Sequence, residues 1–251
     1  MKLLNFLEKN YFLQDLIVWL INRVPAPIHH NIEKIKAIRR AFAYTGQEGI
    51  KGDYLEFGVF QGTSLIAAIN AFRYQNDCYG GKNIGDKCRF IGCDSFEGLR
   101  REPEYDKSHP VFDDQMQLAV PYDMVVKRLR KYQKSNEIKI VKGYYCDTLP
   151  GPEFQNLGIK KLRVVFFDCD LKSSTQDALK YSAPYWQEGT VLIFDDFFAY
   201  KGNLNDGEHG AFKEFCEKHP EFTYRHFGYY GFDGVLFVVV TPPVFKSEQK
   251  E

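Results

Sequence analysis

GDYLEFGVFQGTS, residues 52–64, is the stretch of the chain that decides its fold. It begins as a short strand with an acidic residue, Glu56, near its end, and it passes Gly58 and Gly62 before a helix begins at Thr63. Glycines let a backbone approach a ligand closely, and a helix N-terminus presents free N–H groups. This order is typical of open α/β sheets that bind a nucleotide-like ligand at their strand ends, although a tight turn alone would give the same pattern.

The spacing of the glycines is wrong for a dinucleotide. A nicotinamide-binding fingerprint would place glycines at positions 58, 60 and 63, but Phe60 and Thr63 stand at the last two of these positions. Without a pyrophosphate to accommodate, Glu56 fits a ligand that carries a cationic amino group. A nicotinamide-dependent oxidoreductase on a similar sheet is the rival enzyme.

The rest of the chain alternates between strand and helix patterns. Short apolar runs predict strands at 54–57, 90–93, 138–141, 162–167, 191–194, 222–226 and 235–240. Amphipathic segments predict helices at 64–74, 121–134, 175–186 and 210–218. We therefore expect a Rossmann-like α/β fold, with a mostly parallel seven-stranded sheet and helices on both faces. The last two runs are too close for a helical crossover, so they predict an antiparallel C-terminal hairpin.

The chain divides into three predicted parts. Residues 1–50 form a helical preface, residues 51–245 form the ligand-binding domain, and residues 246–251 form a polar tail. The preface contains two predicted helices, of which the first ends before Pro25 and the second covers residues 32–43.

The first of these helices has an apolar face that needs a partner. Apolar side chains recur at helical spacing from Leu3 to Ile21, but Glu8, Lys9 and Asp15 interrupt the run. The segment is therefore neither a signal peptide nor a transmembrane span. We expect it to cover the active site or to join sister subunits into a homo-oligomer. Interfacial membrane attachment is the alternative.

Composition excludes some partners. The 251 residues contain 33 Lys and Arg against 33 Asp and Glu, so no overall positive field favours nucleic acid. The cysteines are scattered without zinc-ligand spacing, which indicates reduced thiols and a cytoplasmic protein: Cys78, Cys88, Cys93, Cys146, Cys169 and Cys216. Pairing or metal sharing by Cys78 and Cys88 is the less favoured alternative.

Acidic residues follow three further strands. Asp94 comes after the second strand, where a carboxylate can accept hydrogen bonds from ribose hydroxyls. Asp168 and Asp170 follow one later strand, and Asp195 and Asp196 follow another. Carboxylates that converge at one sheet edge repel each other unless a cation lies among them, so a divalent metal such as Mg²⁺ is expected. Helix capping by Asp94, Asp170 or Asp196 is the alternative.

These motifs together resemble the macrocin O-methyltransferase family of class I S-adenosylmethionine-dependent methyltransferases. The resemblance covers residues 50–240 and rests on Glu56-x-Gly58-x-x-x-Gly62, Asp94-Ser95-Phe96-Glu97-Gly98-Leu99, Asp147-Thr148-Leu149-Pro150, Asp168-x-Asp170-Leu171-x-Ser173-Ser174-Thr175 and Asp195-Asp196-Phe197. It implies that Glu56, Gly58, Gly62 and Asp94 contact S-adenosylmethionine and that Asp168, Asp195 and Asp196 bind the metal. In such enzymes the metal binds neighbouring hydroxyls of a sugar, so a sugar or a natural-product glycoside is the implied acceptor.

The expected donor site also includes Thr63, Ser64, Ser95 and Asp168. Methyl transfer to an oxygen needs an aligned acceptor and a base for its proton. Candidates for the base are Lys172, His109 and His209. Lys172 stands where family members usually carry Tyr, but metal-dependent catechol-type methyltransferases have a lysine base shortly after the equivalent aspartate.

Two questions stay open at this point. The insertion at residues 75–87 is unusual for the family, and its role does not follow from the sequence. A methyltransferase-like subunit that binds without catalysis is the non-enzymatic alternative, which the intact acids at the strand ends oppose.

Overall fold

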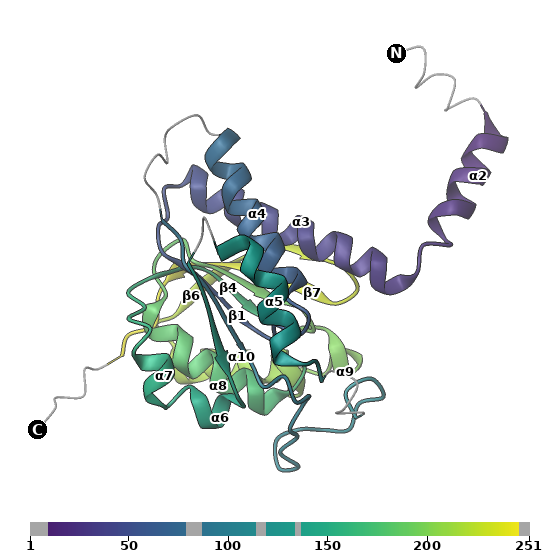
Figure 1. Ribbon diagram of the computed structural model, residues 1–251. Helices are drawn as coiled ribbons and strands as arrows, with labels where there is room; N and C mark the ends of the chain where they lie inside the picture. The colour runs from purple at the N-terminus through teal and green to yellow at the C-terminus, as the bar shows by residue number, and fades with distance from the viewer. Residues whose placement is uncertain (1–9, 79–86, 114–118, 134–136, 246–251) are drawn as a thin grey trace, which may run out of the picture.

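Seven strands form one sheet in the order β3-β2-β1-β4-β5-β7-β6 (Figure 1). The computed structural model describes residues 10–78, 87–113, 119–133 and 137–245. The strands are β1 (Asp53–Phe57), β2 (Phe90–Asp94), β3 (Ile138–Lys142), β4 (Leu162–Phe167), β5 (Val191–Phe194), β6 (Thr223–Tyr230) and β7 (Gly234–Thr241). β1 to β5 pair in parallel, whereas β7 is antiparallel to both β5 and β6. The predicted parallel sheet with a C-terminal hairpin is confirmed.

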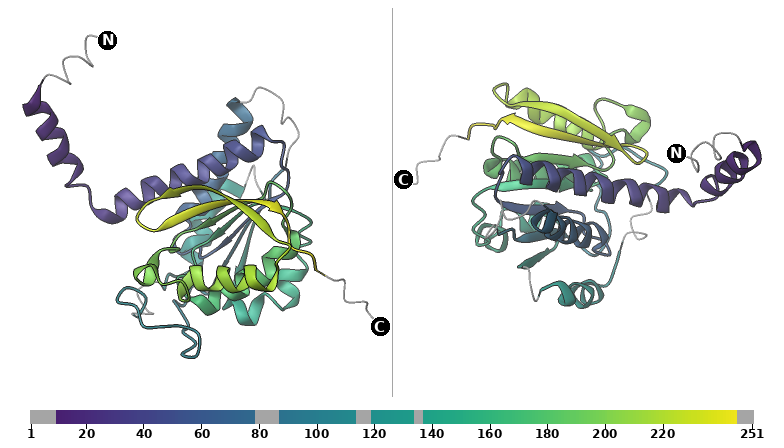
Figure 2. Two further views of the ribbon diagram at one scale, coloured as in Figure 1. Left: turned by 180° about the vertical axis from the view of Figure 1, so that it is seen from behind. Right: turned by 90° about the horizontal axis from the view of Figure 1, so that it is seen from above.

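Helices cover both faces of the sheet. They are α2 (Tyr11–Ile21), α3 (Ala26–Gln47), α4 (Thr63–Cys78), α5 (Tyr122–Gln133), α6 (Tyr145–Thr148), α7 (Pro152–Gln155), α8 (Lys172–Ser182), α9 (Ala199–Gly202) and α10 (Gly207–Lys218), with a 3₁₀ turn η2 (Ala183–Tyr185). α3 and α4 lie on one face, and α8 and α10 lie on the other (Figures 1 and 2). The alternation of β1 matches this arrangement, because Tyr54 packs in the core under α3 and α4 while Leu55 and Phe57 pack in the opposite core.

α3 begins earlier than predicted. We expected a helix at residues 32–43 because the two prolines before it indicated a break, but α3 starts at Ala26. Pro25 is its N-cap, and Pro27 lies in the first turn, where a missing N–H costs no intrahelical hydrogen bond. The extra turn makes His30 helical, one turn before Lys34. Further along, α3 buries residues such as Ile38 against the sheet, so the second half of the preface is part of the core.

α2 stands away from the rest of the chain. It contains no buried residue, and both views of Figure 2 show it projecting from the end of α3. The expected docking of this helix on its own domain is therefore not seen among the described residues. The apolar residues before position 10 that were predicted to belong to this helix lie outside the described residues. No helix in the described part of the chain is long and apolar enough to cross a membrane.

The region of the predicted insertion is partly helical. α4 continues to Cys78, so the first residues of the 75–87 segment extend this helix rather than form a surface loop. Residues 79–86 lie outside the described part of the chain, as does the tail at 246–251.

Candidate functional site

A cavity of ≈ 510 Å³ opens at the carboxyl ends of the parallel strands. Open α/β sheets bind their ligands at this edge. The loops after β1 to β5 supply most of the lining, and α3, α8 and the β6–β7 turn supply the rest. Its polar and charged lining includes Asp94, Ser95, Arg100, Asp168, Asp170, Asp177, Asp196 and Asp233, together with His30, Lys34 and His109.

Asp94 lines the cavity on the side of β1 and β2. Its Oδ2 accepts hydrogen bonds from the backbone N–H groups of Val59 and Phe60, both at 2.7 Å, and its Oδ1 accepts one from Phe96 at 2.6 Å. The carboxylate thus holds the turn after β1 against the end of β2. Gly58 is required there, because its φ is 93° and a Cβ would lie 2.0 Å from the carbonyl oxygen of Asp168. Gly58, Asp94 and Ser95 all line the cavity.

Glu56 lies beneath this side of the cavity and is not among the described residues that line it. Its side chain is fully buried and accepts hydrogen bonds from the hydroxyl of Tyr54 at 2.5 Å and of Ser64 at 2.9 Å. Burial raises the pKa of Glu56 from 4.5 to about 8. Gly62 and Thr63 are likewise outside the lining, and Thr63 accepts a hydrogen bond from Arg128. These residues stabilise the turn after β1 and the start of α4, next to the cavity but outside its lining.

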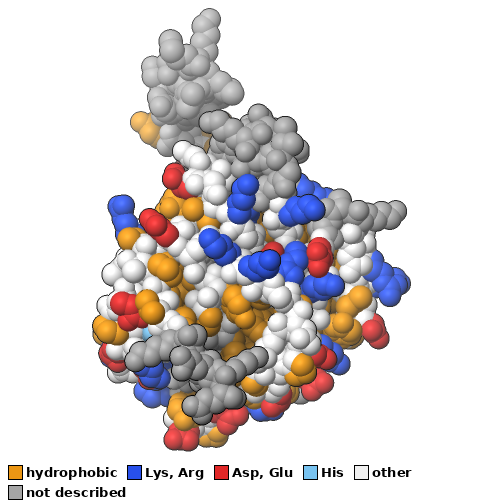
Figure 3. Space-filling view, turned by 90° about the vertical axis from the view of Figure 1, so that its left-hand side faces the viewer, with side chains coloured by type: hydrophobic (Ala, Val, Ile, Leu, Met, Phe, Trp, Pro, Cys, Tyr) orange, Lys and Arg blue, Asp and Glu red, His pale blue; other side chains and the backbone are white. Residues whose placement is uncertain are grey.

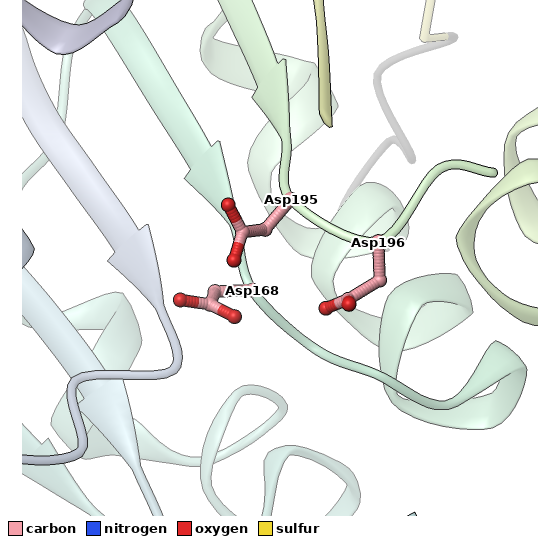
Figure 4. Close-up of side chains that lie close together, drawn as sticks. All are labelled: Asp168, Asp195 and Asp196. Carbon is pink, nitrogen blue, oxygen red and sulfur yellow. The ribbon is translucent and has the colours of Figure 1, made fainter. Parts of the chain in front are cut away.

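Asp168, Asp195 and Asp196 converge at the ends of β4 and β5 (Figure 4). One carboxylate oxygen of each lies within 4.8 Å of the others. Such a set of oxygen donors fits a hard divalent cation such as Mg²⁺ or Mn²⁺.

Glu208 of α10 fixes the two loops that carry these acids. Its Oε1 accepts a hydrogen bond from the N–H of Cys169 at 3.1 Å, and its Oε2 accepts one from the N–H of Asp196 at 3.0 Å. The side chain is fully buried, and burial raises its pKa well above the usual range. Sequence reasoning missed this residue, because it follows a helix start rather than a strand.

α3 brings two basic residues to the acids. The Nζ of Lys34 lies 2.6 Å from Oδ2 of Asp195 and 3.0 Å from Oδ2 of Asp168. The Nε2 of His30 lies 3.2 Å from both carboxylate oxygens of Asp195. The hydroxyl of Tyr230 donates to Oδ1 of Asp195 at 2.7 Å. Burial would raise the pKa of Asp195, but the charge of Lys34 and the hydrogen bond with His30 bring it below its usual value.

Asp170 and Asp196 form a second pair. Their side chains interact, and each carboxyl affects the pKa of the other. Burial raises the pKa of Asp170 to about 6 and that of Asp196 well above its usual range. Neither is a helix cap, because Leu171 is the N-cap of α8 and Phe198 is that of α9. Asp170 also has a φ of 59°, which is unusual for a residue other than glycine.

The three predicted bases occupy different places. His109 lines the cavity and stacks on Phe112 at 4.3 Å, and burial lowers its pKa. The Nζ of Lys172 lies 2.5 Å from Glu214 of α10, and Lys172 is not among the described lining residues. His209, whose Nδ1 lies 3.0 Å from the carbonyl oxygen of Leu204, is also outside the lining.

The loop at residues 99–113 covers the cavity and carries His109. Its anchor is Asp106, a buried residue whose carboxylate accepts hydrogen bonds from the N–H of Ser173 at 2.9 Å and its hydroxyl at 2.6 Å. Lys107 adds an ion pair with Asp206 at 2.9 Å. These contacts fix the loop to the start of α8 and to the residue before α10.

The surface carries charges of both signs. On the face shown in Figure 3, basic and acidic side chains are mixed, and hydrophobic side chains gather in a hollow in its lower half. Neither sign covers this face, in agreement with the balanced composition.

Comparisons with known proteins bear on this site. A family described as macrocin-O-methyltransferase (TylF) matches residues 30–218, a range that includes the cavity and its acids. The 8-demethyl-8-(2,3-dimethoxy-alpha-L-rhamnosyl)-tetracenomycin-C 4'-O-methyltransferase of Streptomyces olivaceus is 31% identical over 159 residues, which are 60% of this chain and 54% of that protein. The mycinamicin III 3''-O-methyltransferase of Micromonospora griseorubida is 23% identical, over 60% of this chain and 57% of that protein. The chain thus spans just over half the length of these two curated relatives.

Solved structures share the fold. The O-methyltransferase NovP superposes with a TM-score of 0.65 at 23% identity, over 83% of this chain and 80% of that one. The calicheamicin methyltransferase CalS11 gives a TM-score of 0.62 at 20% identity and covers 90% of each chain. The class I methyltransferase fold predicted from the sequence is thereby confirmed.

Proposed function

The chain belongs to the macrocin O-methyltransferase family, and from this premise we propose that it transfers a methyl group from S-adenosylmethionine to a hydroxyl group. The acceptor that we propose is a sugar or a glycosylated small molecule, since two curated relatives are named for methylation of such compounds. The observation that carries the proposal is one cavity that Asp94 lines after β2 and that Asp168 and Asp196 line after β4 and β5. A donor beside Asp94 and an acceptor beside the other acids would meet within a single pocket.

The donor would lie beside Asp94. When bound, S-adenosylmethionine supplies a methyl group on a positively charged sulfur. Asp94 can accept hydrogen bonds from ribose hydroxyls with the lone pairs that its backbone partners leave available. Gly58, Ser95 and Asp168 would contact the donor from the cavity wall, whereas the other predicted contacts, Glu56, Gly62, Thr63 and Ser64, would support the turn from beneath.

The metal would lie among Asp168, Asp195 and Asp196, whose donor set fits Mg²⁺. When bound, the ion stabilises the negative charge that develops on the acceptor oxygen. The chain's own part is to hold the carboxylates in place, which Glu208 does through the backbone of Cys169 and Asp196.

The acceptor's proton needs a base near the acids. We assign this role first to Asp170, because it lines the cavity and is a carboxyl group beside Asp196 of the proposed metal set. His109 is the second candidate, since it also faces the cavity from the covering loop. To act as the base, Lys172 would first have to break its ion pair with Glu214, and His209 would have to break its contact with the carbonyl oxygen of Leu204.

We further propose that the protein works in the cytoplasm as a homo-oligomer joined by its N-terminal helices. Cys93, Cys146, Cys169 and Cys216 are free thiols, which agrees with a reducing compartment. α2 exposes large apolar side chains, among them Phe12 at 78% and Trp19 at 50%. A second copy of the chain could bury them. Peripheral membrane attachment is the competing proposal for the same helix.

Calorimetry with S-adenosylhomocysteine tests the donor site. We expect Asp94→Ala to weaken binding about ten- to hundredfold, because hydrogen bonds to a charged group contribute about 1.5–3 kcal/mol. Asp94→Asn should fall between this variant and the wild type, since the amide retains one acceptor oxygen. Asp123→Ala, on the exposed start of α5, is the matched control and should bind normally. Equal affinity in Asp94→Ala, with thermal melting that confirms its fold, would show that the ribose site is misplaced.

A further inference from the structure

We propose that Lys34 is a built-in counter-cation that competes with the divalent metal for Asp168 and Asp195 and thereby sets the metal affinity of the site. The inference rests on the metal site of the proposed function. It adds a residue from α3, a helix that the sequence motifs for donor and metal binding do not include.

The first argument is position. The ammonium group of Lys34 bridges Oδ2 of Asp168 and Oδ2 of Asp195, at 3.0 and 2.6 Å. Both residues belong to the set that would hold the metal. Any cation that binds this set therefore has to share two of its three carboxylates with Lys34.

The second argument is charge. The side chain of Lys34 is only 13% exposed and that of Asp195 only 6%, so water screens the pair poorly. The three metal-binding carboxylates carry a negative charge that the ammonium partly offsets before any metal binds. A divalent ion at the same carboxylates would be repelled by the ammonium group. Its net attraction to the site would therefore be weaker than without Lys34.

The third argument is the crowding of Asp195. Its two oxygens receive the hydroxyl of Tyr230, the imidazole of His30 and the ammonium of Lys34. His30 is held in turn, because its ring stacks on Phe232 at 5.4 Å and its Nδ1 lies 3.4 Å from the N–H of that residue. Lys34 has a flexible side chain that already lines the cavity, so it is the partner that can move aside.

The position of α3 allows the Lys34 side chain to return to Asp168 and Asp195 after a metal has left. One turn beyond it, Ala37 and Ile38 are buried against the sheet, which fixes the helix while its long side chain moves. Displacement of the ammonium by the metal therefore needs no movement of the helix.

The test is Mn²⁺ binding by calorimetry to EDTA-treated protein without donor or acceptor. We expect Lys34→Met to bind Mn²⁺ at least tenfold more tightly than the wild type. Lys34→Arg retains the charge and should stay within about threefold of the wild type by the same electrostatic argument. Lys36→Met is the matched control, because Lys36 is an exposed lysine of the same helix that pairs with Glu33 outside the metal set, and the Mn²⁺ affinity of this variant should not change.

Other outcomes overturn the inference. Equal or weaker Mn²⁺ binding by Lys34→Met would show that Lys34 does not compete with the metal. If the Met variant fails to fold, Lys34→Gln takes its place under the same expectation, with S-adenosylhomocysteine binding as the check on the fold. If no variant binds Mn²⁺, both this inference and the metal site are wrong. Donor binding by the same proteins would still report separately on the methyltransferase proposal.

Discussion

Glu56 is a buried carboxyl group at the end of β1, where a contact with the donor was predicted. Its hydrogen bonds to Tyr54 and Ser64 hold it in the core under α4. A strand alternates its side chains between two faces, and a motif does not say which face opens into the cavity. The effect of burial on the Glu56 carboxyl group can be measured through the pH dependence of the protein's stability.

We expect the stability of the protein without ligands to fall as the pH rises from 5 to 8, and Glu56→Gln to reduce this dependence. Burial raises the pKa of Glu56 from 4.5 to about 8, so between these values the native state retains a proton that the unfolded chain has lost. The free energy of unfolding then decreases with pH by about 1 kcal/mol per unit. Urea unfolding of both proteins at several pH values measures it. Identical pH profiles would mean that Glu56 is already ionised in the native state.

Among the elements, strands were easier to predict than the helices that accompany them. Each predicted strand matches an observed one within a few residues. β1, β2, β4 and β5 are buried on both faces and therefore leave continuous apolar runs in the sequence. The start of α3 was harder to predict, because Pro25 and Pro27 indicated a break between two helices, whereas they lie at the N-terminus of α3. The part that was missed contains His30, a residue of the acid site.

The acid cluster was predictable, but its basic partners were not. Asp168, Asp195 and Asp196 follow strands whose ends must meet at one sheet edge, so their convergence follows from the topology. Lys34 is separated from Asp168 by 134 positions, and no local pattern joins a helix in the preface to a particular strand end. Its role depends on how α3 packs, which only the structure shows.

α2 gives a prediction at the scale of the element. Its exposed apolar side chains should join copies of the chain, so removal of residues 1–24 should lower the molar mass measured by light scattering. Leu20→Asp places a charge on the same surface and should have a similar effect, while Asp15→Asn, which retains the apolar side chains, should not.

The same three proteins separate the alternatives for α2. A wild-type chain that is already monomeric would contradict the oligomer. If Leu20→Asp abolishes binding to anionic vesicles and leaves the mass unchanged, the helix attaches to membranes instead.

For the molecule as a whole, the sheet brings Asp94 and the acids after β4 and β5 together at the carboxyl ends of its parallel strands. Asp94 holds the turn after β1, while Lys34 of α3 pairs with the acids that follow β4 and β5. The loop at residues 99–113, anchored at Asp106, lines the same cavity. This arrangement agrees with the match to the macrocin O-methyltransferase family, which extends from residue 30 to residue 218 rather than over a single motif.

The most direct test of this account is the rate of methyl transfer from labelled S-adenosylmethionine to a panel of nucleotide sugars and glycosides, before and after treatment with EDTA. We predict transfer by the wild type, its loss on chelation with S-adenosylhomocysteine binding retained, and its return with Mg²⁺. Asp195→Asn should bind S-adenosylhomocysteine normally and lose at least a hundredfold in rate, because an amide cannot balance the charge of the ion as a carboxylate does. An EDTA-treated wild type that transfers methyl groups at the original rate would contradict the metal-assisted mechanism. A chain that binds the donor and methylates no acceptor in the panel would contradict the proposed activity.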